Sequence, residues 1–164
     1  MPKTFNALHQ ELQNAANKER ALINARFFKT GKGEYGEGDI FLGITVPDTR
    51  KIAKKYIHLS FENIKQLLQS KFHEERLVGL LILVERYDKH PEQRIAILDF
   101  YLQHSCFVNN WDLVDLSADK IIGRHLYCTR ENKYELLKRF AQSQNVWERR
   151  IAIIATFFFI KKRQ

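Results

Sequence analysis

Apolar residues recur every three or four positions along almost all of this sequence, and this spacing limits the possible folds more than any other feature. Residues three and four positions apart lie on one face of an α-helix, so the spacing is that of helices with one buried face. Runs of five or more residues that alternate between apolar and polar, as a half-buried strand requires, are almost absent. The sequence therefore predicts an all-α protein.

The apolar stripes and the capping residues together predict where the helices lie. We expect a first helix over residues 4–28 with one apolar stripe, made of Phe5, Leu8, Leu12, Ala15, Ala16, Leu22 and Ile23. Further helices are expected over residues 61–69, 73–87, 91–104, 110–125, 130–141 and 146–162. Pro47 suits the first turn of a helix that carries a run of basic residues, and the expected N-caps are Ser60, Thr129 and Asn145.

A glycine-rich segment over residues 30–39 interrupts the helical pattern. Its glycines sit between helices and do not follow a strand, so they do not form a phosphate-binding loop. We expect a loop here, whose far end is docked to the core by Ile40, Phe41 and Leu42.

Short connections between helices of this length predict antiparallel neighbours, and successive pairs stacked side by side would form a solenoid. A weak internal echo supports this arrangement, because Trp111-Asp112 recurs as Trp147-Glu148, and a related segment at residues 73–76 lies earlier. The spacing fits HEAT-like helix pairs. A helical bundle without repeats is the alternative.

The charge balance favours acidic partners. Lys and Arg number 27 against 19 Asp and Glu, which gives a formal net charge of +8, and such an excess attracts phosphate-rich molecules. A solvated basic surface with no nucleic-acid partner is the alternative. Hydrophobic residues make up 45% of the chain, a proportion typical of a folded domain.

Several classes of site are not predicted. Cys106 and Cys128 belong to no CxxC pair and are expected to be reduced and partly buried. The histidines occur singly, so we expect neither a metal nor a cofactor. The N-terminus lacks the apolar stretch of a signal peptide, and the apolar run over residues 151–160 is too short to span a bilayer. The expected location is cytoplasmic, with no membrane partner.

Two tryptophan motifs carry the residues best suited to chemistry. Trp111 and Asp115 are four residues apart, so a helix places the indole and the carboxylate on one face. Asp112 points elsewhere, and we interpret it as a structural acid in the first turn of its helix.

The second motif begins the last predicted helix, where Trp147 and Arg150 are three residues apart and share a face. If the two helices belong to adjacent repeats, Trp111, Asp115, Trp147 and Arg150 converge on one concave surface. The alternative is that both tryptophans fill the core and Asp115 pairs with an arginine only to satisfy its charge.

Four motifs in order resemble AlkD-type DNA alkylation repair enzymes, which are HEAT-like repeat DNA glycosylases. They are Phe27-Phe28-Lys29…Gly33-Glu34-Tyr35-Gly36, Phe41-Leu42-Gly43-Ile44…Pro47…Arg50, Trp111-Asp112-x-Val114-Asp115 and Trp147-x-x-Arg150. A length of 164 residues suits one domain over residues 1–164. The resemblance implies a right-handed superhelix of HEAT-like antiparallel helix pairs whose concave face holds duplex DNA.

The resemblance also implies an activity, the hydrolysis of the N-glycosidic bond of cationic alkylpurines such as 7-methylguanine and 3-methyladenine. Asp115 would stabilise the positive charge of the sugar and position water, Trp111 would face the cationic nucleotide, and Arg150 would hold a phosphate. The family is understood to act without moving the damaged base into a deep pocket.

Other basic and aromatic residues are candidates for binding the DNA backbone, although such residues on a helix usually form only a solvated face. These candidates are Trp147, Arg149, Arg50, Lys51, Lys54, Lys55, Lys161 and Lys162.

The chain is shorter than members of this family usually are, and we expect it to lack their C-terminal repeats. Its last helix would then leave an apolar strip exposed, so either the chain is a fragment or it self-associates through that end. A non-catalytic HEAT-like module that binds DNA or protein is the first alternative to the enzyme, and a structural interaction protein is the second.

Overall fold

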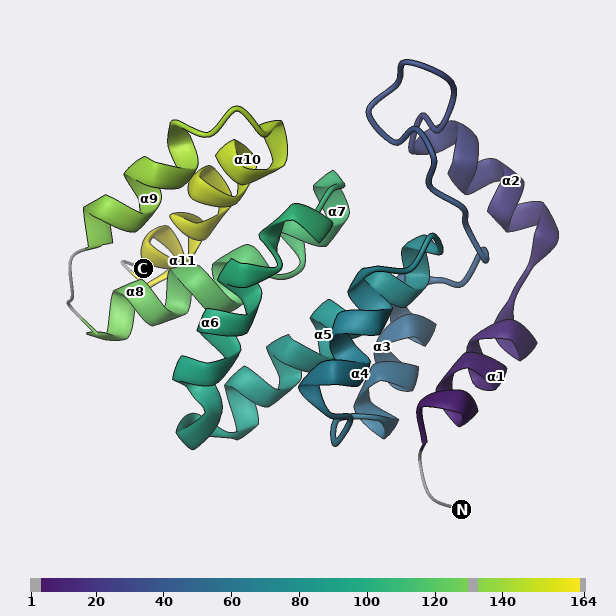
Figure 1. Cartoon of the computed structure of the whole chain (residues 1–164), viewed down its shortest axis with the longest axis horizontal. Helices are drawn as coiled ribbons and strands as arrows, with labels where there is room; N and C mark the ends of the chain where they lie inside the picture. The colour runs from purple at the N-terminus through teal and green to yellow at the C-terminus, as the bar shows by residue number, and fades with distance from the viewer. Residues whose placement is uncertain (1–3, 130–132, 163–164) are drawn as a thin grey trace. The chain divides into compact units, whose positions relative to one another are not determined.

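The computed structural model describes residues 4–129 and 133–162, and the regular structure in these ranges is helical apart from one isolated β-bridge between Ile40 and Phe72 (Figure 1). This confirms the prediction of an all-α protein. The chain divides into two compact units, Met1–Glu85 and Arg86–Gln164. The solenoid arrangement and the single domain over residues 1–164 stay predictions.

The N-terminal unit holds four helices and most of a fifth. They are α1 (Phe5–Ala15), α2 (Lys18–Phe27), α3 (Val46–Lys55), α4 (Phe61–Leu68) and α5 (His73–Lys89), which runs on into the C-terminal unit. The apolar faces of these helices supply a core in which several side chains are fully buried, among them Leu8, Leu12, Ile64, Leu67, Val78 and Leu80. Ser60 caps α4 as expected, because its hydroxyl accepts a hydrogen bond from the amide of Asn63 at 3.2 Å.

The helix predicted over residues 4–28 is two helices, so that prediction is wrong. The chain breaks at Ala16 and Asn17, where the Asn17 amide donates to the carbonyl of Leu42 at 2.8 Å and its side chain caps α2. A bond to a distant segment thus replaces the helical one. After the break the apolar stripe does not continue into the core, since Leu22 and Ile23 are 66% and 64% exposed.

The segment after the glycine-rich loop docks to the core much as predicted. Phe41 and Leu42 are buried, and the Phe41 ring contacts those of Phe28 and His73 at centroid distances of 4.8 Å and 4.5 Å. Ile40 is the exception, because its side chain is 43% exposed. Its backbone makes the attachment instead, accepting from the amide of His73 at 2.8 Å.

A buried carboxylate holds the same segment from the side of α5. Glu74 is 2% exposed, and its two oxygens accept backbone hydrogen bonds from Leu42 at 2.8 Å, Gly43 at 2.8 Å and Ile44 at 3.2 Å. The Glu74 carboxylate therefore satisfies three backbone amides that no helix pairs. The sequence analysis did not find this role for Glu74.

Gly43 is expected to tolerate no side chain. Its φ is +78°, and a Cβ there would lie 2.2 Å from the Asn17 carbonyl oxygen and 2.6 Å from the Ala21 amide nitrogen. Gly43→Ala should lower the free energy of unfolding by about 2–3 kcal/mol, through backbone strain and the clash together. Gly33 is the matched control, because its φ is +81° but nothing lies within 4 Å of its Cβ position. Gly33→Ala should cost only the strain, about 1 kcal/mol; equal losses in urea denaturation would contradict the expected clash.

The C-terminal unit is built from shorter helical pieces. They are the 3-10 helices η1 (Pro91–Gln93) and η2 (Ser105–Phe107), the π-helix η3 (Asp119–Gly123), and the α-helices α6 (Arg94–Gln103), α7 (Trp111–Asp115), α8 (Arg124–Thr129), α9 (Lys133–Ala141), α10 (Val146–Ala155) and α11 (Phe157–Lys161). In this unit α10 packs against α9, α7 and η3 (Figure 1). Its core includes Ile97, Leu113, Val114, Ile121 and Ile151.

The helix predicted over residues 110–125 is wrong as one element, because it divides into α7, the π-helix and the start of α8. Ser117 lies at the division. Its hydroxyl donates to the carbonyl of Leu113 at 2.6 Å and is 2.9 Å from the hydroxyl of buried Tyr101. Serine side chains that bond their own backbone in this way compete with the helical pattern.

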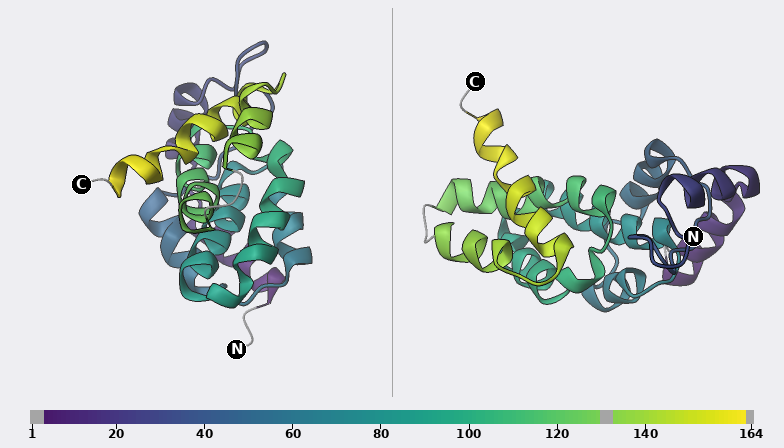
Figure 2. Two further views of the ribbon diagram at one scale, coloured as in Figure 1. Left: turned by 90° about the vertical axis from the view of Figure 1, so that its left-hand side faces the viewer. Right: turned by 90° about the horizontal axis from the view of Figure 1, so that it is seen from above.

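The helix predicted over residues 146–162 is likewise interrupted at Thr156, whose hydroxyl donates to the carbonyl of Ile153 at 2.7 Å. After this break α11 continues in the general direction of α10, as both views in Figure 2 show. Asn145 caps α10 as expected, accepting from the amide of Trp147 at 2.9 Å.

Thr129 is the last residue of α8, and its hydroxyl donates to the carbonyl of His125 at 3.0 Å. The amides that it was predicted to cap lie outside the described residues. Cys106 and Cys128 are free, as expected, but both are exposed. The predicted helix start at residue 130 lies outside the described residues.

A buried aspartate in the π-helix is expected to make the unit sensitive to acid. Asp119 is 4% exposed and accepts hydrogen bonds from Lys161 and Lys120 at 2.8 Å and 2.9 Å. Burial raises the pKa of this carboxyl, but the two lysines together outweigh that effect, so its pKa is below the ordinary value.

A carboxyl with a lowered pKa stabilises the fold above its unfolded pKa of about 4, and this stabilisation is lost as the pH falls through the folded value. The free energy of unfolding should therefore fall between about pH 5 and pH 3, and Asp119→Asn should make the fall shallower. Urea denaturation at a series of pH values measures both curves. Parallel curves for the two proteins would show that Asp119 contributes nothing to the acid sensitivity.

Candidate functional site

The first tryptophan motif begins at a helix start that its own sequence dictates. Asn110 is fully buried, and its side chain accepts a hydrogen bond from the amide of Trp111 at 2.8 Å, which opens α7. Within the helix Leu113 and Val114 face the core, so Asp115 lies on the other side of this short helix, partly exposed.

The second motif has the same local construction. Asn145 caps α10, Trp147 lies in its first turn, and Ile151 and Ile154 bury the inner face of the helix. Arg150 projects from the side of α10 that meets α7, because these two helices pack against each other.

Asp115 and Arg150 form a two-bond ion pair, which is the central feature of the site. The Arg150 Nε donates to one carboxylate oxygen of Asp115 at 2.8 Å, and its Nη2 donates to the other at 2.7 Å. This is the strong, planar form of the interaction. It raises the pKa of Arg150 above its ordinary value.

The pair remains open to solvent. The Arg150 and Asp115 side chains are 39% and 33% exposed. A guanidinium has five N–H donors, of which Asp115 takes two, and each carboxylate oxygen keeps a further lone-pair direction. Asp115 can therefore accept a hydrogen bond from a water molecule while Arg150 donates one to an anion.

Trp111 and Trp147 each begin their motif, and both are partly exposed, so neither is fully buried. Their roles at the site stay predictions. Asp112 is different from Asp115, since it is 6% exposed and accepts from the amide of Leu113 at 2.8 Å in the first turn of α7. That position agrees with its interpretation as a structural acid.

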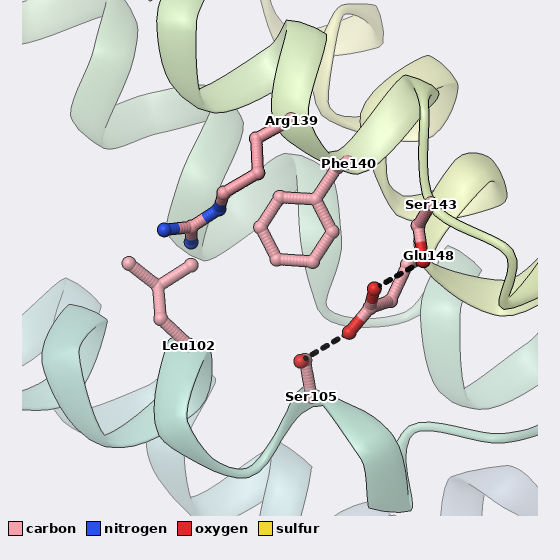
Figure 3. Close-up of a pocket in the computed structure, with 6 residues that line it drawn as sticks. All are labelled: Leu102, Ser105, Arg139, Phe140, Ser143 and Glu148. Carbon is pink, nitrogen blue, oxygen red and sulfur yellow. Dashed lines mark hydrogen bonds between the residues drawn. The ribbon is translucent and has the colours of Figure 1, made fainter.

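Glu148 holds the first turn of α10 in place, and its side chain lines a cavity next to that turn (Figure 3). Its two carboxylate oxygens accept hydrogen bonds from the hydroxyls of Ser105 at 2.9 Å and Ser143 at 2.6 Å. The carboxylate thereby joins η2 and the α9–α10 turn to the helix that carries Arg150. The cavity has a volume of about 330 Å³ and is lined by Leu102, Ser105, Arg139, Phe140, Ser143 and Glu148.

A comparison with protein families gives the context for this geometry. The family model for the DNA alkylation repair enzyme matches residues 8–164, which is nearly the entire chain. The chain belongs to this family. Among curated proteins, none matches it.

Membership in the DNA alkylation repair enzyme family indicates an enzyme whose partner is DNA. In the described part of the chain, no group of three or more His, Cys, Asp or Glu side chains could hold a metal ion. Over the same residues, every helix is too short or too polar to cross a bilayer.

The predicted DNA-binding residues near the pair have a structural task as well. Arg149 is exposed, and its Nη1 donates to the carbonyls of Ser143 and Gln144 at 2.8 Å and 3.0 Å, where it secures the α9–α10 turn. Its contact with DNA stays a prediction.

The basic residues of α3 belong to the N-terminal unit. Lys51 pairs with Asp48 at 3.0 Å, and Lys55 pairs with Glu11 of α1 at 2.5 Å. Lys54 is exposed and Arg50 is partly exposed. The ion pairs account for two of the four charges within this unit, and the binding of phosphates by α3 stays a prediction.

The sequence analysis did not find the role of Glu148. Asn145 and Glu148 have the three-residue spacing of a capping box, but the Asn145 amide donates to the Ser143 hydroxyl at 3.0 Å, and Glu148 accepts from two serine hydroxyls instead. The serines that Glu148 contacts come from other elements, and no local pattern identifies them.

Proposed function

We propose that this protein is a DNA glycosylase that hydrolyses the N-glycosidic bond of cationic alkylpurines, 7-methylguanine and 3-methyladenine, in duplex DNA. The observation that carries the proposal is the partly exposed Asp115 carboxylate, held in a fixed orientation by two hydrogen bonds from Arg150. Family membership supports it.

The chemistry requires little beyond one oriented carboxylate. A purine alkylated on a ring nitrogen already carries a positive charge, so it leaves with the electrons of the bond to C1′ and becomes neutral without being protonated. The sugar then has oxocarbenium character, which a nearby anion stabilises. Water adds to C1′ and loses a proton to Asp115 and then to solvent, leaving the free base and an abasic site.

The neighbouring residues supply binding and orientation. Arg150 keeps donors for a backbone phosphate while it holds Asp115. Trp111, partly exposed on the same short helix, offers a ring face to the cationic nucleotide. An open surface of this kind can act on a base that stays close to the DNA duplex, so the proposal does not require a deep pocket.

The test measures release of 7-methylguanine from methylated duplex DNA by the full chain. Release that depends on enzyme concentration and is lost in Asp115→Asn supports the proposal; duplex binding without release refutes it.

That second outcome would favour a non-catalytic module that binds DNA. One observation favours this alternative, because Arg150 engages both oxygens of Asp115, as it would in a purely structural ion pair.

Arg150→Gln tests whether Arg150 contacts a backbone phosphate in addition to holding Asp115. The dependence of the logarithm of duplex affinity on the logarithm of salt concentration should become shallower by about 1, because one phosphate contact is lost. Lys138→Gln, at an exposed residue of α9, is the control for loss of charge alone. Equal slopes for wild type and Arg150→Gln would show that Arg150 does not contact a phosphate.

A further inference from the structure

A second cavity lies in the C-terminal unit and shares no lining residue with the Asp115–Arg150 site. Its volume is about 620 Å³, within the range of small-molecule sites, and it is lined by Asp88, Arg124, Tyr127, Cys128, Phe158 and Lys162. These residues come from the end of α5, from α8, and from α11 and the residue after it. α8 and α11 pack against each other (Figure 1).

Two cations line this cavity, and the structure positions both. The Arg124 Nη1 donates to Asp88 at 2.5 Å, and the guanidinium lies over the ring of Tyr87 at 5.9 Å from its centroid. The Lys162 ammonium lies over the ring of Phe158 at 5.8 Å. Arg124 keeps donors that Asp88 does not use, and the three charged groups leave a net positive charge that suits one anion.

An exposed aromatic ring lies beside these cations. Tyr127 is 41% exposed, and its ring contacts those of Phe158 and Phe159 at centroid distances of 5.6 Å and 6.2 Å. Because two rings of α11 support it, Tyr127 can stack against a planar ligand at little cost in side-chain entropy.

We propose that this cavity binds one nucleotide, with its base stacked on Tyr127 and its phosphate between Arg124 and Lys162. An aromatic platform beside a cation pair is the combination by which proteins hold unstacked nucleotides. The nucleotide is either a free nucleoside monophosphate or one unit of a single strand. This site goes beyond the proposed glycosylase, since none of its residues takes part in that chemistry.

Cys128 provides a direct reporter, because its exposed thiol lines the cavity. The only other cysteine, Cys106, lies in η2 and is also exposed. Cys106→Ser therefore leaves one reactive thiol in the cavity, and Cys128→Ser leaves one outside it as the matched control.

The experiment measures the rate of alkylation of Cys128 by iodoacetamide in the Cys106→Ser protein. Deoxyadenosine monophosphate should slow the reaction, whereas deoxyadenosine and inorganic phosphate, which each satisfy half of the site, should slow it far less. Protection by a deoxyadenosine hexamer at lower concentration identifies a strand as the source; protection by the monophosphate alone identifies a free nucleotide.

Three results would overturn the proposal. They are no protection by either nucleotide probe at millimolar concentration, equal protection by inorganic phosphate, and equal protection of Cys106 in the control protein.

Variants add a second criterion. Tyr127→Ala and Lys162→Gln should each raise the nucleotide concentration needed for half protection by about tenfold, as expected for a lost stacking or phosphate contact. Tyr127→Phe should restore binding, and Lys138→Gln, outside the cavity, should not change it.

Asp115→Asn should also leave protection unchanged, so failure of the glycosylase and failure of this site are distinguishable. Wild-type affinity in Tyr127→Ala would refute the stacked arrangement.

Discussion

Asp115→Asn is expected to reduce 7-methylguanine release from methylated duplex DNA by about 100- to 1,000-fold, the loss typical when one preorganised electrostatic contact to a transition state is removed. Asparagine has nearly the same shape but no charge, so the oxocarbenium-like sugar loses its counter-ion. One of the two bonds from Arg150 is lost as well, because an amide nitrogen then faces a guanidinium N–H.

The measurement is single-turnover release of the base, with duplex affinity determined in parallel. Affinity should change little, because the substitution leaves the proposed phosphate contact of Arg150 in place, and a loss confined to the chemical step identifies a transition-state contact. Asp99→Asn, at an exposed aspartate of α6, is the matched control and should be unaffected. Wild-type release by Asp115→Asn would rule out the proposed mechanism.

Glu74→Gln is expected to lower the free energy of unfolding by about 3 kcal/mol, the upper end of the cost of leaving a buried hydrogen-bonding group unsatisfied. The carboxylate accepts three backbone amides with two oxygens, at 2.8 Å, 2.8 Å and 3.2 Å. A glutamine places an NH₂ group against at least one of these amides, so a buried donor meets another donor.

Urea denaturation of the full chain measures this change. Glu62→Gln, an exposed acid in the first turn of α4, is the control and should cost less than about 1 kcal/mol. A loss for Glu74→Gln no larger than that of the control would mean that the segment around Gly43 is held mainly by apolar packing.

The sequence predicted the helical class and most helix positions, because an apolar period of three to four residues is a direct record of one buried face. It missed the breaks at Ala16, Ser117 and Thr156. At each break the competing bond comes from a distant carbonyl or from a hydroxyl to its own backbone. Such bonds leave no trace in hydrophobic periodicity.

The candidate site was predictable to a similar degree. Spacing alone placed Trp111 with Asp115 and Trp147 with Arg150 on shared faces, and the structure joins Asp115 to Arg150. Glu148 accepts a hydrogen bond from Ser105, and Glu74 accepts one from Leu42. In both cases the partner is more than thirty residues away along the chain and lies in another element. No pattern within one helix could identify them.

Glu148 bears on how firmly the Asp115–Arg150 ion pair is held. Since its carboxylate ties the opening turn of α10 to Ser105 and Ser143, any rocking of that turn must first break a hydroxyl bond in the neighbouring cavity. Arg150 lies in the same helix as Glu148, so the alignment of Arg150 with Asp115 depends on contacts outside the ion pair. Loss of either serine contact is therefore expected to loosen the alignment of Arg150 with Asp115.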